Sequence, residues 1–246
     1  MTGFSGKRYW LVGASEGLGR ALAQQMAAEG AELILSARDA GRLADLAASL
    51  SGARAVPCDV ADDASVARAA EAAGPVDGVV FLAGVYWPVA ARDWDAARVT
   101  AMCDVNFTGC ARVLGAVVPG MVARGSGHIV ITGSLSGFRG LPGAVGYAAS
   151  KAGCMMLAEC LHADLRGTGV RVQVANPGFI RTRLTARNDF SMPFLMEPGA
   201  AAAAMLAHMR TGRFKANFPR VFSWFFRLGQ LMPDALWYRL VAPRRG

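Results

Sequence analysis

Cysteine and histidine are scarce in this chain of 246 residues, and their spacing argues against a disulfide framework or a metal site. The five cysteines are an odd number, and no two of them have the Cys-x-x-Cys spacing of a zinc or redox motif. The three histidines stand far apart in the sequence. We therefore expect neither a bound metal nor disulfides, and we expect a reducing compartment, the cytoplasm.

A long hydrophobic run is also absent. No apolar stretch reaches the roughly 20 residues that cross a bilayer, and the first residues lack the apolar segment and cleavage site of a signal peptide. Hydrophobic residues make up 53% of the chain and charged residues 18%, which is the composition of a globular protein. These features predict a soluble, non-exported protein that is large enough for one well-buried α/β domain.

Acidic residues are nearly absent from the end of the chain, and this accounts for most of the net charge of +8. Up to residue 209 there are 18 basic and 17 acidic side chains, a net charge of +1. From residue 210 onward there are 8 basic side chains and a single acidic one, Asp234, a net charge of +7. Because the excess is confined to the tail, the sequence does not predict a nucleic-acid-binding face.

Short apolar runs alternate with amphipathic stretches over the first two thirds of the chain. Leu18, Leu22 and Met26 stand four residues apart, which places one apolar stripe on a helix. The runs at 77–83 and 127–133 are almost entirely apolar, as in strands that helices cover on both faces. Repeated strand–helix units with right-handed crossovers predict an α/β fold with a doubly wound, parallel, Rossmann-like sheet. The expected strands are residues 8–13, 31–37, 53–58, 77–83, 127–133 and 169–175.

A glycine-rich turn, Gly13-Ala14-Ser15-Glu16-Gly17-Leu18-Gly19, follows the first expected strand and begins a helix. Glycines let the backbone approach a pyrophosphate closely, and the helix N-terminus attracts it. At the end of the second strand, Ala37-Arg38 stands where an acidic residue would bind the ribose hydroxyls of NAD. The Arg38 guanidinium suits a 2′-phosphate and favours NADP, whereas the Glu16 carboxylate would repel that phosphate.

Tyr147 and Lys151 form the next candidate group. They stand four residues apart in a helical pattern, which places them one turn apart on the same helix face. An ammonium beside a tyrosine favours the phenolate, which suits a general acid and base acting on an alcohol or carbonyl oxygen. Ser134 follows the strand at 127–133, at the edge where a parallel sheet presents its functional loops, and its hydroxyl could hydrogen-bond the same oxygen.

With these motifs in this order, the chain resembles the classical short-chain dehydrogenase/reductase family over roughly residues 7–185. The glycine motif is Gly13, Gly17 and Gly19, and Asn106, Ser134, Tyr147 and Lys151 match the catalytic residues. The cofactor contacts that we expect in addition are Ser15, Glu16, Leu18, Arg38, Asp59, Val60, Ala83, Gly84, Tyr147, Lys151, Pro177, Gly178, Ile180 and Thr182.

The resemblance implies a role for each catalytic match. Tyr147 would exchange a proton with the substrate oxygen as hydride moves to or from the nicotinamide. Lys151 would favour the Tyr147 phenolate and bind the nicotinamide ribose. Ser134 would orient the substrate oxygen, and Asn106 would help to hold a water of the proton relay. The resemblance assigns the adenine contact to Asp59 and Val60, and the carboxamide contact to Thr182.

The chain departs from the family pattern in three places. Val12 stands where the family usually has threonine, and Phe81-Leu82-Ala83-Gly84 replaces Asn-Asn-Ala-Gly. The chain also lacks the family's usual ending, a last strand and a Val-Asp-Gly-Gly segment used in tetramer packing. We therefore expect a homo-oligomer of the size of a dimer.

Residues 210–246 form a basic, aromatic-rich extension after a catalytic domain at 1–209. Eight of the chain's 21 aromatic residues fall between 214 and 238. One interpretation is two short helices that pack on the domain or on a partner subunit. Another is an amphipathic segment that rests on an anionic membrane surface or caps an apolar substrate pocket. Before this tail, the stretch 183–200 is expected to form a lid with an apolar lining of Phe190, Met192, Phe194, Leu195 and Met196.

The sequence therefore predicts an NADP(H)-dependent oxidoreductase that interconverts a carbonyl and an alcohol, with an apolar or lipid-like substrate. One alternative is an NAD-preferring dehydrogenase, which the relative affinity for the two cofactors would distinguish. A second is a regulatory or membrane-peripheral protein that binds NADPH but turns over no carbonyl. The complete set of Asn106, Ser134, Tyr147 and Lys151 argues against that second alternative.

Overall fold

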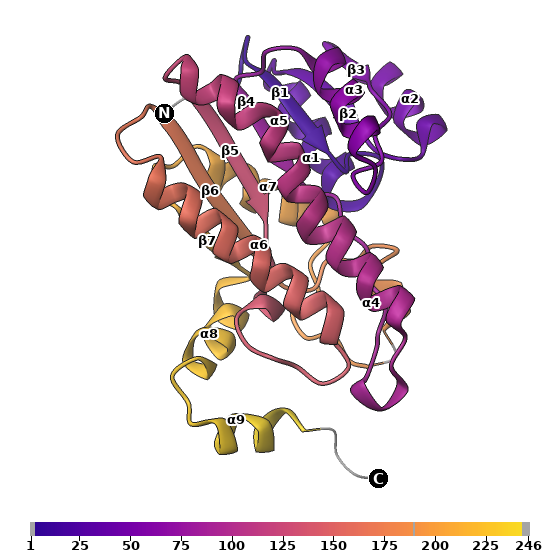
Figure 1. Cartoon of the computed structure of the whole chain (residues 1–246), viewed down its shortest axis with the longest axis vertical. Coiled ribbons are helices and arrows are strands. Elements are labelled where there is room, and N and C mark those ends of the chain that lie inside the picture. Colours follow the sequence, from indigo (N-terminus) through magenta and orange to yellow (C-terminus); the bar gives the residue numbers. More distant parts are fainter. Residues whose placement is uncertain (1–2, 189, 243–246) are drawn as a thin grey trace.

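The computed structural model describes residues 3–188 and 190–242, and a parallel sheet lies at its centre (Figure 1). In this part of the chain seven strands pair in the order β3-β2-β1-β4-β5-β6-β7. The chain order reverses between β1 and β4, so the sheet has the switch point of a doubly wound fold. The strands are β1 (Arg8–Val12), β2 (Glu32–Ser36), β3 (Ala53–Ala55), β4 (Gly78–Phe81), β5 (Gly127–Thr132), β6 (Val170–Pro177) and β7 (Lys215–Phe218).

Helices cover both faces of the sheet, as its apolar strands require. On one face α1, α2 and α7 bury apolar residues such as Leu22 and Met205 against the sheet. On the other face α3, α5 and α6 bury residues such as Val113 and Met155. The helices are α1 (Gly17–Ala28), α2 (Ala40–Ala48), α3 (Asp63–Ala73), α4 (Ala96–Cys103), α5 (Gly109–Ala123), α6 (Val145–Asp164) and α7 (Pro198–Met209).

Three neighbouring strands end at the same level. Val12 of β1 pairs with Ser36 of β2 and with Phe81 of β4. The glycine-rich turn, Ala37-Arg38 and Leu82-Ala83 therefore all leave the sheet at one edge. Ligands of open α/β sheets bind at this carboxyl edge, beside the switch point. The register alone thus brings together segments that are far apart in the sequence.

The predicted fold class is confirmed, with small differences at the strand ends. The third strand stops at Ala55 instead of residue 58, and the sixth runs on to Pro177 instead of residue 175. Beyond Ala55 the backbone still pairs, since the N–H groups of Val56 and Cys58 donate to Leu35 and Ala37, so the apolar pattern extends past the assigned strand.

The expectation that the chain lacks a last strand is wrong. β7 pairs in parallel with Val174–Pro177 of β6. Its sequence, Lys-Ala-Asn-Phe, contributes one fully buried residue, Phe218, so the hydrophobic pattern is weak. The open edge of β6 supplies the pairing partner that the sequence pattern does not show. This strand lies inside the segment 210–246, so the proposed separation of that segment from 1–209 stays a prediction.

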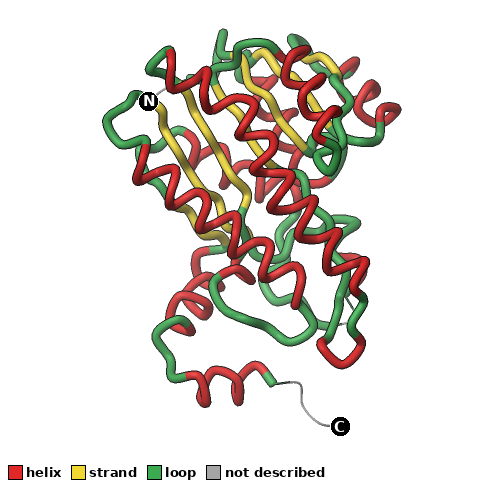
Figure 2. The backbone as a smooth tube through the Cα atoms, viewed as in Figure 1, coloured by secondary structure: helices red, strands yellow, loops and turns green. Residues whose placement is uncertain are grey.

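Two short helices follow β7 and extend away from the carboxyl end of the sheet (Figures 1 and 2). They are α8 (Arg220–Gly229) and α9 (Asp234–Val241). Phe226 and Trp237 on their inner sides form a small core with Leu135. Trp237 Nε1 also donates a hydrogen bond of 3.0 Å to the carbonyl of Gly140. The tail is therefore packed on the domain, as one of the two interpretations of its sequence expects.

One helical run, Ala96–Ala123, is long and apolar enough to cross a membrane by length and composition. It consists of α4, η2 (Asp104–Thr108) and α5, and it packs against α3 and α6 of the same domain. It also carries Asn106, which is fully buried. Its apolar composition is accounted for by its place as a flanking helix of the sheet.

Candidate active site

The glycine-rich turn brings the start of α1 close to its neighbours. A Cβ at Gly13, whose φ is +98°, would collide with the backbone N of Ala83. A Cβ at Gly19 would collide with the carbonyl O of Gly13. No side chain caps the first turn of α1, so its backbone N–H groups remain available to an anion. The turn is therefore built for close approach and leaves a helix N-terminus free.

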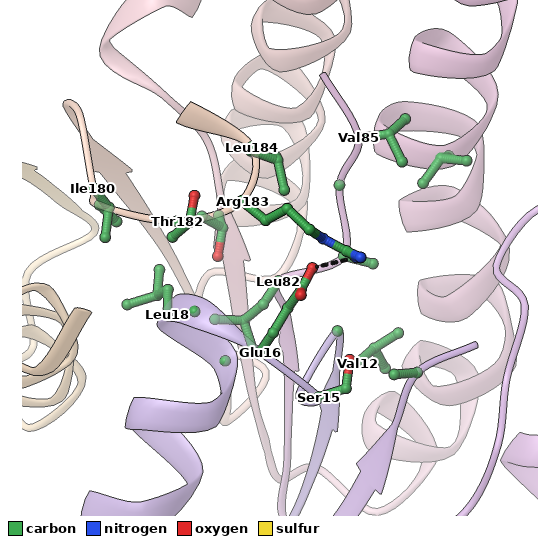
Figure 3. Close-up of a pocket in the computed structure, with 18 of the residues that line it drawn as sticks. Val12, Ser15, Glu16, Leu18, Leu82, Val85, Ile180, Thr182, Arg183 and Leu184 are labelled. Atoms are coloured by element: carbon green, nitrogen blue, oxygen red, sulfur yellow. Dashed lines mark hydrogen bonds and ion pairs between the residues drawn. The ribbon is translucent and has the colours of Figure 1, made fainter. Parts of the chain in front are cut away.

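Glu16 bridges two arginines at this turn. Its carboxylate pairs with Arg42 of α2 at 2.8 Å and with Arg183 of the segment after β6 at 2.8 Å. Figure 3 shows Arg183 reaching from the segment around Thr182 to meet Glu16. The carboxylate that the sequence sets beside a phosphate site thus has two guanidinium partners, which offset its negative charge.

Asp39 has side-chain partners in α2, whereas its neighbour Arg38 has none in the described part of the chain. Asp39 caps α2: its carboxylate accepts a hydrogen bond from the backbone N–H of Arg42, which lowers the pKa of Asp39. Its other carboxylate oxygen pairs with the Arg42 side chain at 2.6 Å. Arg38 is exposed, and no hydrogen bond or ion pair engages it within residues 3–188 and 190–242. The acidic group is therefore committed to the helix, whereas the Arg38 guanidinium is free for a ligand.

A cavity of about 560 Å³ collects nearly all of the predicted cofactor residues. Asp59 is the exception: its carboxylate accepts a hydrogen bond from the Ala61 N–H and lies in a separate hollow that Arg38 also lines. The predicted residues that line the cavity are Gly13, Ser15, Glu16, Gly17, Leu18, Gly19, Arg38, Val60, Ala83, Gly84, Tyr147, Lys151, Pro177, Gly178, Ile180 and Thr182.

Tyr147 and Lys151 both line this cavity. Lys151 is buried, and its Nζ donates a hydrogen bond of 2.9 Å to the carbonyl of Thr132, at the end of β5. That bond holds the ammonium 5.9 Å from the centre of the Tyr147 ring. Tyr86 packs edge-on against the same ring, with 5.0 Å between the ring centres. The phenol is thus held between an aromatic wall and a buried positive charge.

Asn106 lies behind the cavity instead of lining it. It stands in η2, a π-helical segment between α4 and α5, and π-bulges of this kind are frequent at functional sites. Its Oδ1 accepts a hydrogen bond from the N–H of Val85 at 2.7 Å, and its Nδ2 donates to the Val85 carbonyl at 3.0 Å. Nδ2 also lies 3.0 Å from Ser150 Oγ on α6. Asn106 therefore ties the segment after β4 to the helix that carries Tyr147.

Ser134 begins η3 (Leu135–Gly137), directly after β5. Its Oγ accepts a hydrogen bond from the Ser136 N–H at 3.2 Å and lies 2.8 Å from Ser136 Oγ. The side chain is almost fully buried and lines a second cavity of about 530 Å³. Tyr147, Gly178, Leu184 and Thr185 line both cavities. The two cavities therefore meet at Tyr147.

The second cavity has mostly apolar walls, and the lid and the tail both contribute to them. Phe190 is the one member of the predicted lid lining that reaches it. Phe222 packs against Phe179 and Phe226, with ring centres 5.7 Å and 5.1 Å apart. Other apolar residues in its walls are Pro88, Leu135, Leu141, Pro142, Leu184 and Val241. The tail thus forms part of a pocket wall, as one interpretation of the sequence expects.

Several residues of the two cavities were not singled out from the sequence. Arg42 lies in α2, four residues after Arg38, and that short distance in the sequence is the signal that could have pointed to it. Arg183 directly follows Thr182 in the predicted motif. No local signal points to Tyr86, Phe179 or the inner residues of α8, because only the tertiary fold brings them to Tyr147.

Residues 7–191 match the family model described as short chain dehydrogenase. The chain belongs to the short-chain dehydrogenase/reductase family. An uncharacterized oxidoreductase of Myxococcus xanthus is 41% identical over 237 residues, which cover 92% of each chain. The ketoacyl reductase HetN of Nostoc is 32% identical over 204 residues, covering 79% of this chain and 71% of that protein.

A solved structure supports the same assignment. A short-chain dehydrogenase from Sphingobium yanoikuyae in complex with NADPH superposes with a TM-score of 0.82 at 27% identity, covering 97% of this chain and 96% of that one. This short-chain dehydrogenase/reductase is therefore an oxidoreductase that acts on a CH–OH or carbonyl group with NAD(P).

Proposed function

We propose that this enzyme interconverts an apolar ketone or aldehyde and its alcohol with NADP(H), using Tyr147 as the acid and base. The observation that supports this most directly is the position of Tyr147, which lines both the polar and the apolar cavity. A group that exchanges a proton with the substrate has to reach the substrate oxygen where cofactor and substrate meet. The shared wall of the two cavities is such a place.

The residues of the polar cavity fit a dinucleotide phosphate. The close contacts at Gly13 and Gly19 and the uncapped N-terminus of α1 suit a pyrophosphate. Arg38 is free for a 2′-phosphate, Arg42 lies beside it, and Ala37 offers no carboxylate to the ribose. The similar Sphingobium enzyme is solved with NADPH. These features favour NADP over NAD, and the same groups would hold it here.

Each proposed catalytic residue has a defined task. Bound NADPH would supply the hydride. Tyr147 would donate its phenolic proton to the carbonyl oxygen, and the Lys151 ammonium would stabilise the phenolate that remains. Ser134 Oγ would donate a hydrogen bond to the same oxygen. Asn106 would act behind them as a positioning residue for Val85 and α6 and, by the family resemblance, for a relay water.

The apolar cavity supports a bulky or chain-like substrate. Its walls are mostly apolar and carry four phenylalanine rings, those of Phe179, Phe190, Phe222 and Phe226. A substrate without charge loses little hydration in such a pocket and gains from burial of its apolar surface. The relative HetN is named a ketoacyl reductase, which is in line with a ketone on an alkyl chain.

The test is a steady-state assay of NADPH oxidation with ketones of increasing alkyl length. We expect turnover that improves with chain length, and a much lower kcat/KM with NADH. Arg38→Ala should raise the Kd for NADPH by about 10- to 100-fold and leave the Kd for NADH unchanged. A higher kcat/KM with NADH would support the NAD-preferring alternative. Tight NADPH binding without turnover of any carbonyl would support the regulatory alternative.

We also propose a homodimer in a reducing compartment, the cytoplasm, with contact to a membrane surface through the tail. Phe107, Val122 and Met156 are exposed on η2, α5 and α6, the helices on which the family resemblance places a dimer interface. All five cysteines are free, as a reducing compartment allows. Light scattering of the purified protein would measure the mass of the particle.

A further inference from the structure

Helix α8 carries apolar side chains on two adjoining faces. Phe222, Phe226 and Gly229 face inward, toward the apolar cavity and Trp237. Val221, Trp224, Phe225 and Leu228 follow the i, i+3, i+4, i+7 spacing of a second stripe, and all four are exposed. Phe225, at the border of this outer stripe, also packs on Trp237, with 5.4 Å between the ring centres, and the stripe as a whole is open to solvent.

Helix α9 repeats the arrangement. Trp237 and Val241 point inward, whereas Leu236 and Leu240, one turn apart, are each about half exposed. In residues 3–188 and 190–242, fourteen large apolar side chains are exposed, and eight of them lie between 221 and 240. Scattered exposed apolar residues are ordinary, but a concentration of this kind marks an interaction surface.

The charges on these helices have one sign. Arg220, Arg227 and Arg239 are exposed, and none of them pairs with a carboxylate in the described part of the chain. The guanidinium of Arg227 lies over the ring of Trp224, 4.3 Å from its centre. Asp234 is neutralised by Arg139 of the domain. The outer face therefore combines apolar and aromatic groups with uncompensated positive charge.

We propose that the outer face of α8 and α9 docks on the surface of an anionic lipid bilayer. Aromatic and aliphatic side chains bordered by arginines match the interfacial region of such a bilayer in both polarity and charge. The helices have 10 and 8 residues, far fewer than the roughly 20 needed to span, so they lie on the surface. A second copy fits less well, because a two-fold interface would bring the same unpaired arginines together.

The two faces of these helices connect the bilayer to the active site. The inner residues Phe222, Phe226 and Val241 wall the apolar cavity that ends at Tyr147. With the outer face on the bilayer, only α8 and α9 would lie between an apolar ketone dissolved there and the cavity. We place the entry of the substrate on this side, a step that rests on the proposed function.

Flotation with vesicles tests the docking without any need for turnover. The probes are vesicles of phosphatidylcholine alone and of an equimolar mixture with phosphatidylglycerol. We expect the wild-type chain to float with the mixed vesicles only, and high salt to reduce the bound fraction. Trp224→Glu should lower the bound fraction about tenfold or more. The matched control is Trp94→Glu, a tryptophan of similar exposure outside the tail, which should float like the wild type.

Two results would overturn the proposal. One is a wild-type chain that stays with the soluble fraction in the presence of mixed vesicles. The other is a Trp224→Glu variant that floats as well as the wild type. If the chain ignores vesicles and Trp224→Glu instead converts a dimer to a monomer in light scattering, the face is a subunit interface.

A second measurement separates substrate entry from catalysis. Trp224→Glu should keep the wild-type kcat/KM for a water-soluble ketone. Its kcat/KM for a ketone presented inside mixed vesicles should be several-fold lower than that of the wild type. Equal activity of the two proteins on the vesicle-bound ketone would contradict entry from the bilayer. An enzyme that floats but turns over neither ketone would contradict the proposed function and leave the docking intact.

Discussion

Glu16 is the residue whose effect on the cofactor depends most on its surroundings. Taken alone, a carboxylate at the phosphate turn repels the 2′-phosphate of NADP. In the fold it pairs with Arg42 of α2 and with Arg183 of the segment after β6. A phosphate that enters has to compete with this carboxylate for both guanidinium groups, so Glu16 should weaken cofactor binding without preventing it.

Glu16→Gln should therefore tighten NADPH binding. Removing the charge releases Arg183 and leaves Arg42 paired with Asp39 alone, and we expect a Kd about three- to tenfold lower, which corresponds to roughly 0.7–1.4 kcal/mol. Fluorescence titration with NADPH measures it. The control is Glu29→Gln, which removes a carboxylate paired with Arg210 outside the cavity. Weaker binding by Glu16→Gln would show that the carboxylate mainly positions the two arginines.

At the scale of elements, His128 joins three strands of the sheet. Its Nδ1 lies 2.8 Å from the Tyr9 hydroxyl of β1 and accepts a hydrogen bond of 3.0 Å from Arg171 of β6. Because arginine can only donate, the ring proton is on Nε2, which donates to Gln173 Oε1 at 2.7 Å. Burial, and then the nearby Arg171 charge, lower the pKa of His128 to about 3.

This network predicts acid sensitivity of the fold. The unfolded chain takes up a proton at His128 below about pH 6.5. In the folded chain His128 stays neutral down to about pH 3. The free energy of unfolding therefore falls as the pH drops from about 6.5 to about 3. The single group contributes up to about 1.4 kcal/mol per pH unit. Urea unfolding at several pH values should show a shallower pH slope for His128→Gln, and an unchanged slope would contradict the assignment.

Helix α8 should govern substrate affinity through its inner face. Phe222 lines the apolar cavity and contacts Phe179, Phe194 and Phe226. Phe222→Ala removes that apolar wall, and we expect KM for a long-chain ketone to rise about tenfold with little change in kcat. Val221→Ala, on the exposed side of the same helix, is the matched control for soluble substrates. Equal KM values for the two variants would place the substrate elsewhere.

At the scale of the whole molecule, local patterns predicted the sheet but not its last strand. The runs that became β4 and β5 are almost entirely apolar because helices bury both of their faces, so each carries its own signal. β7 is short and half polar, and it exists because the edge of β6 is open beside it. The four residues of β7 carry no sequence pattern that indicates pairing with a distant strand.

The same distinction separates the predicted from the unpredicted parts of the site. Gly13, Gly19 and Tyr147 are recognisable because their spacing along the chain is the feature that matters. The link from Glu16 to Arg183 spans 167 positions, and the contact of Trp237 with the Gly140 carbonyl spans 97. Residues so far apart in the sequence come into contact only once the whole sheet has formed. The π-helical turn at Asn106 also depends on packing between α4, α5 and α6, which no local pattern encodes.

Tyr147 lines both the polar and the apolar cavity, and the proposed catalysis depends on that position. The most direct test pairs NADPH titration with NADPH oxidation for the wild type, Tyr147→Phe and the control Tyr86→Phe. We predict that Tyr147→Phe binds NADPH like the wild type but loses turnover by about 10²- to 10⁴-fold, and that Tyr86→Phe stays active. A Tyr147→Phe enzyme with wild-type turnover would contradict the account.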